Sequence, residues 1–273
     1  MTRHSVANRS LLFVPGTRPD RVSKALISGA HLVVVDLEDA VAPADKDAAR
    51  NRVAALADLP ELVVRVNGVH TEWYAADLAA LRDAARPPRA VLLPKADAGS
   101  VELAGADLPA TVEVLALVES AQGMREVYDV AEHPRVRQLV FGSIDYALDL
   151  GIMVNGPAEH ELLPARSSLV LASRTAGIAA PIDGVTTELD DLGVTERDAR
   201  RARALGFAGK LAIHPAQVPA IHAGFRPGDA EIADARAVVA AAQDGSAARA
   251  GSRMVDAPVL DRARRLLAEV EGG

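Results

Sequence analysis

Residues 31–39, HLVVVDLED, combine a short apolar run with three carboxylates. The run LVVV has the length and β-branched composition of a strand that is buried on both faces, as strands of parallel sheets are. Asp36, Glu38 and Asp39 follow it within four positions. Because a buried carboxylate without a partner is costly, acids at the end of such a strand indicate a function at that edge of the sheet.

Seven further apolar runs of this kind recur along the chain, and most are followed by an Ala-, Arg- and Glu-rich helical pattern. They are SLLFVPG (10–16), ELVVRVNG (61–68), AVLLPKAD (90–97), VEVLALVES (112–120), VRQLVFGSID (136–145), APIDGVTT (180–187) and GKLAIHP (209–215). Eight strands that alternate with helices predict an α/β fold, a (β/α)8 TIM barrel. The rival is an open doubly wound sheet, but FVPGTRPDR lacks the Gly-x-Gly-x-x-Gly turn that usually follows its first strand.

The pattern changes in the last part of the chain. We expect the barrel to occupy residues 1–222 and a helical extension to occupy residues 223–273. The extension has one helical pattern over about 228–243 and another from about Pro258, with a Gly- and Ser-containing break, DGSAARAGSR, as a flexible hinge at about 244–253. Two interpretations stay open: a lid or an arm onto a neighbouring subunit, and a frayed tail.

Composition excludes several classes of protein. The 273 residues carry a net charge of −7 without a basic block, which argues against nucleic-acid binding. No cysteine is present, so disulfides, thiolate metal sites and cysteine nucleophiles are excluded. The chain has no apolar run long enough to span a membrane, and its N-terminal apolar run is too short for a signal peptide. A cytoplasmic protein is therefore expected.

Polar side chains follow nearly every predicted strand, at the edge where barrel enzymes carry their active sites. They are Asp36, Glu38, Asp39, Arg65, Asn67, Lys95, Asp97, Glu119, Ser120, Ser143, Asp145, Asp183 and His214. Carboxylates so close together repel one another unless a cation lies among them, and oxygen ligands suit Mg²⁺ or Mn²⁺. The alternative is that individual acids cap the following helices, although Glu is a poor N-cap and Arg65 and Lys95 do not cap N-termini.

The alternation of side chains along a strand separates the three acids of the opening stretch. Asp36 and Glu38 share a face with Val34, whereas Asp39 shares the other face with Leu37. If the first pair faces the barrel axis, Asp39 points towards the helices or the loop. We therefore expect Asp36 and Glu38 to serve the site and Asp39 to be structural.

Several motifs, in this order, resemble those of the citrate lyase β-subunit/malyl-CoA lyase branch of the HpcH/HpaI aldolase superfamily. They are RSLLFVPGTRPDRVSKA, VVVDLEDAVAPADK, RVNG, LPKAD, ALVES, FGSIDY and KLAIHPAQV. The resemblance runs from about residue 10 to the end of the chain. It implies a (β/α)8 barrel assembled as a homotrimer or hexamer, and a Mg²⁺-dependent retro-Claisen cleavage, or formation, of the carbon–carbon bond in 3-hydroxyacyl thioesters.

The resemblance also implies roles for individual residues. Glu119 of ALVES and Asp145 of FGSID correspond to the metal ligands, and Arg65 of RVNG to the substrate-binding arginine. Asp256, in MVDAPV, corresponds to a catalytic aspartate that an adjacent subunit supplies. Because Glu119 and Asp145 are the expected direct ligands, we expect Asp36 and Glu38 to hydrogen-bond to metal-bound waters instead of binding the ion themselves.

For the thioester, the resemblance points to the first loop, PGTRPDRVSK, and to the start of FGSID. The expected contacts to substrate or CoA are Pro15, Arg18, Lys24, Gly142 and Ser143. For Lys24, simple solvation of the first helix is the alternative.

The leading hypothesis is a Mg²⁺-dependent 3-hydroxyacyl-CoA lyase of the malyl-CoA or citramalyl-CoA type. Its products would be an acyl-CoA and a 2-oxo acid such as glyoxylate or pyruvate. One alternative is a citrate lyase β subunit acting on citryl-acyl-carrier-protein, and another is a metal aldolase that joins pyruvate to aldehydes without CoA. A third alternative is a catalytically silent acyl-CoA-binding or scaffold barrel, against which Glu119, Asp145 and Arg65 argue.

Overall fold

A computed structural model of the chain describes residues 8–56, 62–84, 87–156, 159–242, 248–250 and 253–271. These residues fall into two compact units, one within 7–225 and the other within 226–273. The larger unit contains the predicted strands and their acids. It is the unit in which the candidate site is built.

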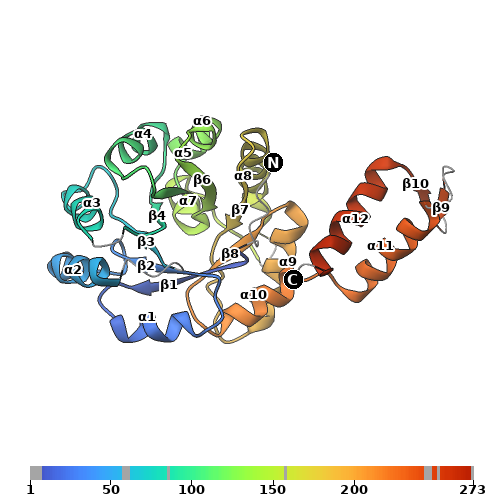
Figure 1. The fold of residues 1–273 in the computed structure, drawn as a ribbon, viewed down its shortest axis with the longest axis horizontal. Helices are drawn as coiled ribbons and strands as arrows, with labels where there is room; N and C mark the ends of the chain where they lie inside the picture. The colour runs from blue at the N-terminus through green and yellow to red at the C-terminus, as the bar shows by residue number, and fades with distance from the viewer. Residues whose placement is uncertain are drawn as a thin grey trace. The chain divides into compact units, whose positions relative to one another are not determined.

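Within the described chain, eight parallel strands close into a barrel in the order in which they occur in the sequence (Figure 1). The strands are β1 (Ser10–Pro15), β2 (Leu32–Asp36), β3 (Leu62–Arg65), β4 (Ala90–Leu93), β5 (Glu113–Val118), β6 (Val136–Phe141), β7 (Ala179–Asp183) and β8 (Gly209–Ala212). Parallel pairing of β8 with β1 closes the sheet. The predicted (β/α)8 barrel is confirmed.

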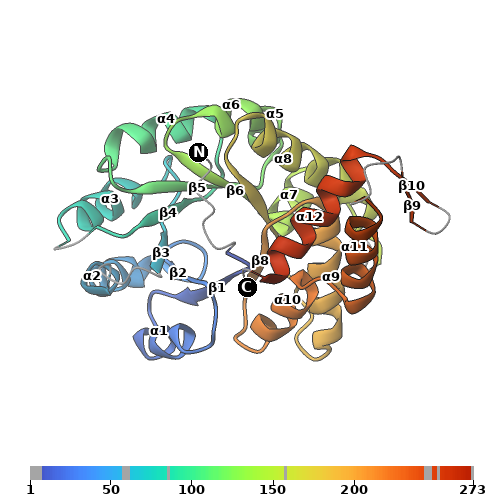
Figure 2. The ribbon, with the colours of Figure 1, turned by 45° about the vertical axis from the view of Figure 1, so that its right-hand side comes forward.

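Helices surround the barrel, as Figure 2 shows from a second direction. They are α1 (Pro19–Leu26), α2 (Lys46–Leu56), α3 (Tyr74–Arg82), α4 (Ala98–Asp107), α5 (Ala121–Arg125), α6 (Val127–Glu132), α7 (Ser143–Asp149), α8 (Leu163–Thr175), α9 (Leu192–Leu205) and α10 (Gln217–Phe225). Two short 3₁₀ turns, η1 (Pro43–Asp45) and η2 (His160–Leu162), precede α2 and α8.

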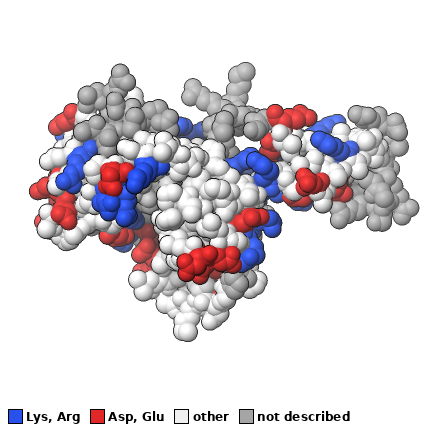
Figure 3. Space-filling view, turned by 90° about the horizontal axis from the view of Figure 1, so that it is seen from below, with Lys and Arg blue, Asp and Glu red and all other residues white. Residues whose placement is uncertain are grey.

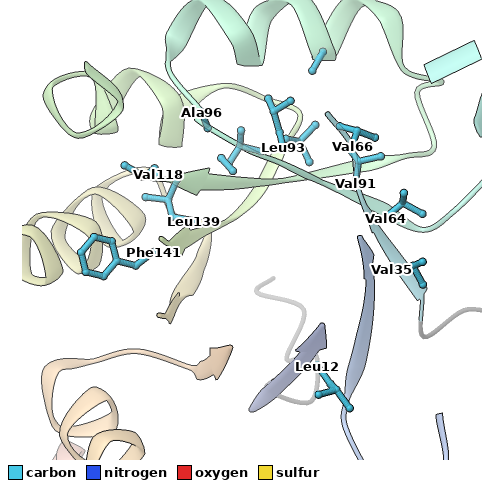
Figure 4. Close-up of a cluster of buried hydrophobic side chains, with 14 of the residues drawn as sticks. Leu12, Val35, Val64, Val66, Val91, Leu93, Ala96, Val118, Leu139 and Phe141 are labelled. Carbon is cyan, nitrogen blue, oxygen red and sulfur yellow. The ribbon is translucent and has the colours of Figure 1, made fainter. Parts of the chain in front are cut away.

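The apolar side chains form two layers, because successive residues of a strand point to opposite faces. The inner cluster fills the barrel and is built mainly from alternate strand residues such as Val34, Val63 and Leu115. The outer cluster joins the other faces of the strands to the helices, and Figure 4 shows part of it around Val35, Val64 and Leu93. Both faces are therefore buried, which explains why the strands read as continuous apolar runs.

The strand register brings the ends of three strands to one level. Asp36, the last residue of β2, lies opposite Pro15 of β1 on one side and opposite Arg65 of β3 on the other. A carboxylate and a guanidinium that are 29 residues apart in the chain are thus placed side by side.

Some of the strand-end polar residues cap helices, as the alternative interpretation allowed. Asp97 accepts a hydrogen bond from the Ser100 amide at 2.7 Å, and Ser100 Oγ accepts one from the Asp97 amide at 2.9 Å. Ser120 Oγ accepts from the Gly123 amide at 3.1 Å. Such caps stabilise a helix by about 1 kcal/mol each. Asp97 and Ser120 are therefore accounted for by α4 and α5.

Helix α10 was not predicted, and its sequence QVPAIHAGF contains both Pro219 and Gly224. The proline lies in the first helical turn, where a missing amide proton is tolerated. A side-chain Cβ at Gly224 would lie 2.5 Å from Cβ of Ala199 and 2.6 Å from the Glu196 carbonyl oxygen. Gly224 is therefore what lets α10 pack closely on α9.

The smaller unit contains α11 (Asp229–Ala242), β9 (Ala248–Ala250), β10 (Arg253–Val255) and α12 (Ala257–Glu271). The two strands pair antiparallel, and Ala235, Val238, Val255 and Ala263 form its core. The predicted hinge at 244–253 lies partly outside the described residues, and its described part belongs to β9 and β10.

Charged side chains of both signs occur on the face of the molecule in Figure 3, and large areas of that face carry neither. Among the described helices, none has both the length and the apolar character that crossing a bilayer requires.

Candidate active site

Arg65 and Asp36 form the centre of the candidate site. The guanidinium donates from Nε to Asp36 Oδ1 at 2.7 Å and from Nη2 to Asp36 Oδ2 at 2.6 Å. Asp36 also accepts the backbone amides of Glu38 and Ala40. A planar, bidentate arrangement of this kind fixes the orientation of the guanidinium as well as its position.

Glu38 lies on the same side of the guanidinium. Its Oε2 is 2.9 Å from Arg65 Nη1, although it accepts no hydrogen bond of suitable geometry from the described residues. Its Oε1 is 3.5 Å from Lys95 Nζ. Burial raises the pKa of Glu38 to about 7, against the opposing charge of Arg65. Asp36 and Glu38 thus meet at Arg65. The expectation that they hold metal-bound waters stays a prediction.

Asp39 occupies a different environment. Its side chain is 64% exposed, and one of its oxygens lies 3.4 Å from Arg65 Nη1. We expected Asp39 to be structural, but it accepts a hydrogen bond from the guanidinium at the centre of the candidate site. The contact with Arg65 makes it an outer partner of the guanidinium.

Three carboxylates and an aromatic ring determine the electrostatics of Arg65. Burial alone would lower the pKa of Arg65, but the hydrogen bonds and charge of Asp36, with the charges of Glu38 and Asp39, raise it above its ordinary value. The guanidinium carbon also lies 5.0 Å from the centre of the Phe13 ring. Arg65 therefore remains a cation throughout the accessible pH range.

Glu119 follows β5 and is almost fully buried. Its Oε1 accepts the Lys95 amide at 2.9 Å, and Lys95 adopts a left-handed backbone conformation with φ of 50°. A Cβ on Gly142 would overlap with Cβ of Glu119 and lie 2.5 Å from its Oε2. Only glycine at position 142 leaves room for the carboxylate where it stands.

The surroundings of Glu119 fit a divalent cation. Burial, then the charge of Glu38, and then that of Asp145 raise the pKa of Glu119 to about 8, although the Lys95 amide opposes this. Asp145 lies in the first turn of α7 and is partly exposed. A cation among these carboxylates would remove their repulsion.

The number of candidate ligands also matters. Among the described residues, no group of three or more His, Asp and Glu side chains is arranged to hold a metal ion. Two carboxylates, Glu119 and Asp145, with the remaining positions left to water or substrate oxygens, match the usual site of Mg²⁺.

The residues expected to contact the thioester lie in two places. Pro15 ends β1, and Arg18 follows it on the surface, where it makes a bidentate pair with Asp20 at 2.9 and 2.8 Å. Lys24 is exposed on α1. Gly142 and Ser143 begin α7 beside Glu119, and Ser143 Oγ is buried without a hydrogen-bond partner among the described residues.

Asp256 belongs to the smaller unit. Its carboxylate is exposed, and its Oδ1 accepts the Val259 amide at 3.1 Å at the start of α12. It serves there as the N-cap of that helix.

Asp183 does not join the carboxylates of the candidate site. It is completely buried, accepts a hydrogen bond from Arg166 Nε at 2.8 Å, and lies 3.8 Å from Lys210 Nζ. Despite its burial, these two cations hold the pKa of Asp183 below its ordinary value. Its position at the end of β7 suggested a place at the rim, whereas the structure gives it a buried ion pair.

Sequence reasoning missed Lys46, which contacts the loop carrying Glu38. A lysine in the first turn of a helix opposes the helix dipole, and that unfavourable placement was the available signal. The length of a lysine side chain leaves its target undetermined by sequence spacing alone.

Comparison with known proteins gives a consistent result. The family described as HpcH/HpaI aldolase/citrate lyase matches residues 9–215. A citrate lyase subunit beta-like protein from Deinococcus radiodurans is 39% identical over 280 residues, covering 95% of this chain and 96% of the relative. A (3S)-malyl-CoA thioesterase from Cereibacter sphaeroides is 33% identical, covering 96% and 94%.

A solved structure has the same fold. The CitE protein from Mycobacterium tuberculosis, in complex with magnesium, acetoacetate and coenzyme A, superposes with a TM-score of 0.87 at 34% identity. The match covers 97% of this chain and 99% of that one.

Proposed function

Because the chain belongs to the HpcH/HpaI aldolase/citrate lyase family, we propose that it is a Mg²⁺-dependent lyase of 3-hydroxyacyl-CoA thioesters. It cleaves the bond between the α- and β-carbons to release an acyl-CoA and a 2-oxo acid such as glyoxylate or pyruvate. The observation that carries the proposal is the oriented guanidinium of Arg65 on the same rim as the buried Glu119 carboxylate. Mg²⁺ and coenzyme A bound to the related CitE support it.

Arg65 binds the carboxylate of the 2-oxo acid half of the substrate. A guanidinium has five N–H groups, and Arg65 donates two of them to Asp36 and one, from Nη1, to Asp39. Its two Nη atoms keep further N–H groups that are able to pair with a second carboxylate. Asp36 and Glu38 hold the guanidinium in place, so the substrate meets a cation that is already oriented.

Glu119 and Asp145 would hold Mg²⁺ in this proposal, and Mn²⁺ could serve in its place. The chemistry that the bound ion supplies is Lewis-acid polarisation of the hydroxyl and carboxylate oxygens of the substrate.

Asp256 of a neighbouring subunit takes the hydroxyl proton. The oxygen then forms the carbonyl of the 2-oxo acid as the carbon–carbon bond breaks, and the electron pair goes to the carbon beside the thioester. The protonated Asp256 then gives its proton to that carbon, which completes the acyl-CoA. A homotrimer or hexamer brings the exposed carboxylate of one chain to the barrel of the next. The coenzyme A part lies against Pro15, Gly142 and Ser143, with Arg18 and Lys24 near its phosphates.

The test is a panel of malyl-, citramalyl- and 3-hydroxy-3-methylglutaryl-CoA incubated with the protein and Mg²⁺. We expect release of acyl-CoA and oxo acid from malyl- or citramalyl-CoA. No turnover of any of them, with or without an acyl carrier protein, contradicts the proposal. Turnover only with citryl-acyl-carrier-protein instead identifies a citrate lyase β subunit.

Subunit sharing has its own test. Asp256→Ala and Arg65→Ala variants are each inactive in the proposal, and mixing them creates sites with both residues intact. Recovered activity in mixed oligomers supports the exchange of Asp256, and its absence after verified subunit exchange contradicts it.

A second candidate function comes from one relative. The Cereibacter sphaeroides protein is named a (3S)-malyl-CoA thioesterase, which breaks the thioester rather than the carbon–carbon bond. Free CoA is then a product, whereas the lyase leaves the thioester intact.

A further inference from the structure

We propose that Lys46 is a positioning residue, which holds the loop bearing Glu38 against Arg65, and that Asn67 and Asp77 hold Lys46 in turn. The inference deepens the proposed function and rests on it for its effect on catalysis. Lys46 itself does not touch the reacting atoms.

The ammonium of Lys46 is fully used within the protein. The residue begins α2 and is only 5% exposed. Its Nζ donates to the Leu37 carbonyl at 2.7 Å, the Glu38 carbonyl at 2.8 Å and Asn67 Oδ1 at 2.6 Å. Three acceptors match the three N–H groups of an ammonium ion. The indole of Trp73 covers it, with the ring centre 4.9 Å from Nζ.

Two of these acceptors belong to the loop that bears Glu38. Leu37 and Glu38 directly follow β2, and the Leu37 amide donates to the Arg65 carbonyl at 2.9 Å. The Glu38 amide donates to Asp36 Oδ1 at 2.9 Å. Lys46 thus fixes the carbonyls of two residues whose amides are fixed by Arg65 and Asp36.

Asn67 is held so that its oxygen faces Lys46. Its backbone amide and its Nδ2 both donate to Asp77 Oδ2, at 2.9 and 2.6 Å. The other oxygen of Asp77 accepts from Arg50 Nε at 2.8 Å. Because Nδ2 of Asn67 donates to Asp77, the side-chain amide is oriented with Oδ1 towards Lys46, where it accepts the third hydrogen bond of the ammonium.

The location of Lys46 is unfavourable for stability alone. Burial lowers the pKa of Lys46 despite the carboxylates around it, and the start of a helix repels a cation. An apolar residue of similar size would avoid both penalties. Only the ammonium supplies the three hydrogen bonds that fix the position of the Glu38 backbone. That position in turn sets the distance of 2.9 Å between Glu38 Oε2 and Arg65 Nη1.

The test compares Lys46→Met with Arg52→Met, which removes an exposed cation from the same helix. Hydrogen–deuterium exchange is followed in peptides covering residues 37–41, and emission is followed from Trp73, the single tryptophan of the chain. In Lys46→Met we expect exchange in this loop to be at least tenfold faster and Trp73 emission to change. Arg52→Met should match the wild type in both.

The kinetic measurement distinguishes positioning from stability. At a temperature where all variants are folded, kcat/KM of Lys46→Met should fall by about 10- to 100-fold, because small displacements at a site have effects of this size. A purely structural role would lower Tm and leave kcat/KM unchanged. If Lys46→Met does not fold, Asp77→Asn, which does not touch the Glu38 loop, should show the same changes to a smaller degree.

Unchanged exchange at residues 37–41 overturns the inference, and so does a loosened loop with kcat/KM within twofold of the wild type. A wild-type protein that releases no 2-oxo acid from any 3-hydroxyacyl-CoA of the panel contradicts the proposed function instead. In that case the exchange and fluorescence results still decide whether Lys46 holds the loop.

Discussion

Asp36 holds Arg65 through two parallel hydrogen bonds of 2.7 and 2.6 Å across neighbouring strands of the barrel. The pair is buried, and Glu38 adds a second carboxylate at 2.9 Å from the same guanidinium. More negative than positive charge therefore surrounds Arg65, and the orientation of its guanidinium is fixed before any substrate binds. This relationship is the basis of the predictions for the site.

Arg65→Lys should lower kcat/KM by at least about 100-fold, or about 2.7 kcal/mol of transition-state stabilisation. An ammonium cannot make the bidentate bond to Asp36 and also present a planar pair of donors to the substrate. Steady-state kinetics with the thioester substrate measures the change, and Arg52→Lys on the surface of α2 is the control. A loss below tenfold would show that orientation of this cation is unimportant.

Glu119→Gln should weaken Mg²⁺ or Mn²⁺ binding by at least about tenfold, because an amide oxygen lacks the charge that a hard cation prefers. Without metal, Tm should be unchanged or higher, since the variant removes a buried carboxylate that its neighbours repel. Calorimetric titration and thermal unfolding in EDTA measure the two effects. Glu113→Gln, at the other end of β5, serves as control, and equal metal affinity in both variants argues against Glu119 as a ligand.

Gly142→Ala should also weaken metal binding by about tenfold or more, although no ligand is altered. Its Cβ would lie 2.5 Å from Glu119 Oε2, so the carboxylate must move. Overpacking of this kind costs about 1–3 kcal/mol of stability. Gly99→Ala in α4, where the nearest atom to the new Cβ is 3.7 Å away, should leave both quantities unchanged. Normal metal affinity in Gly142→Ala would mean that the position of Glu119 is not critical.

Stability should decline in acid partly through His31, at the opposite end of the strands. Its Nδ1 is 3.2 Å from Ser10 Oγ, which is also 2.8 Å from His222 Nε2, and the two imidazole rings are 4.6 Å apart. Burial, with a contribution from Arg9, lowers the pKa of His31. The neutral form is therefore favoured in the folded state.

The sign of the effect follows from linkage. The unfolded chain protonates this imidazole near its ordinary pKa of about 6.5, above the folded value. The contribution of neutral His31 to the free energy of unfolding is thus fully present above about pH 6.5, and it is lost as the pH falls through the pKa of the folded state. The free energy of unfolding of His31→Gln, measured in denaturant, should fall less steeply below about pH 6.5 than that of the wild type. Exposed His70→Gln should behave like the wild type; identical slopes in all three would contradict the assignment.

Periodicity in the sequence was sufficient for much of this architecture. The eight apolar runs became the eight strands because both faces of each strand are buried, which leaves an unbroken apolar signature. Alternation could not separate Asp36 and Glu38 from Asp39, because β2 ends at Asp36 and all three carboxylates contact Arg65.

Contacts between distant segments could not be obtained in this way. The partner of Asp183 is Arg166 on α8. Two of the three targets of Lys46 are backbone carbonyl oxygens, which leave no trace in residue identity. Helix α10 was hidden for a related reason, because Gly224 is explained only by the proximity of α9. Local patterns indicate which face is buried, whereas these contacts depend on which segments meet.

The most direct test of the central claim is an analysis of the products from malyl-CoA or citramalyl-CoA, with Mg²⁺ and again after its removal by EDTA. The free thiol and the 2-oxo acid are measured in the same reaction. The account predicts one equivalent of glyoxylate or pyruvate for each substrate consumed, an intact acyl-CoA, no free thiol, and loss of turnover in EDTA that Mg²⁺ restores. Release of one equivalent of free CoA without any 2-oxo acid would contradict carbon–carbon cleavage and identify thioester hydrolysis.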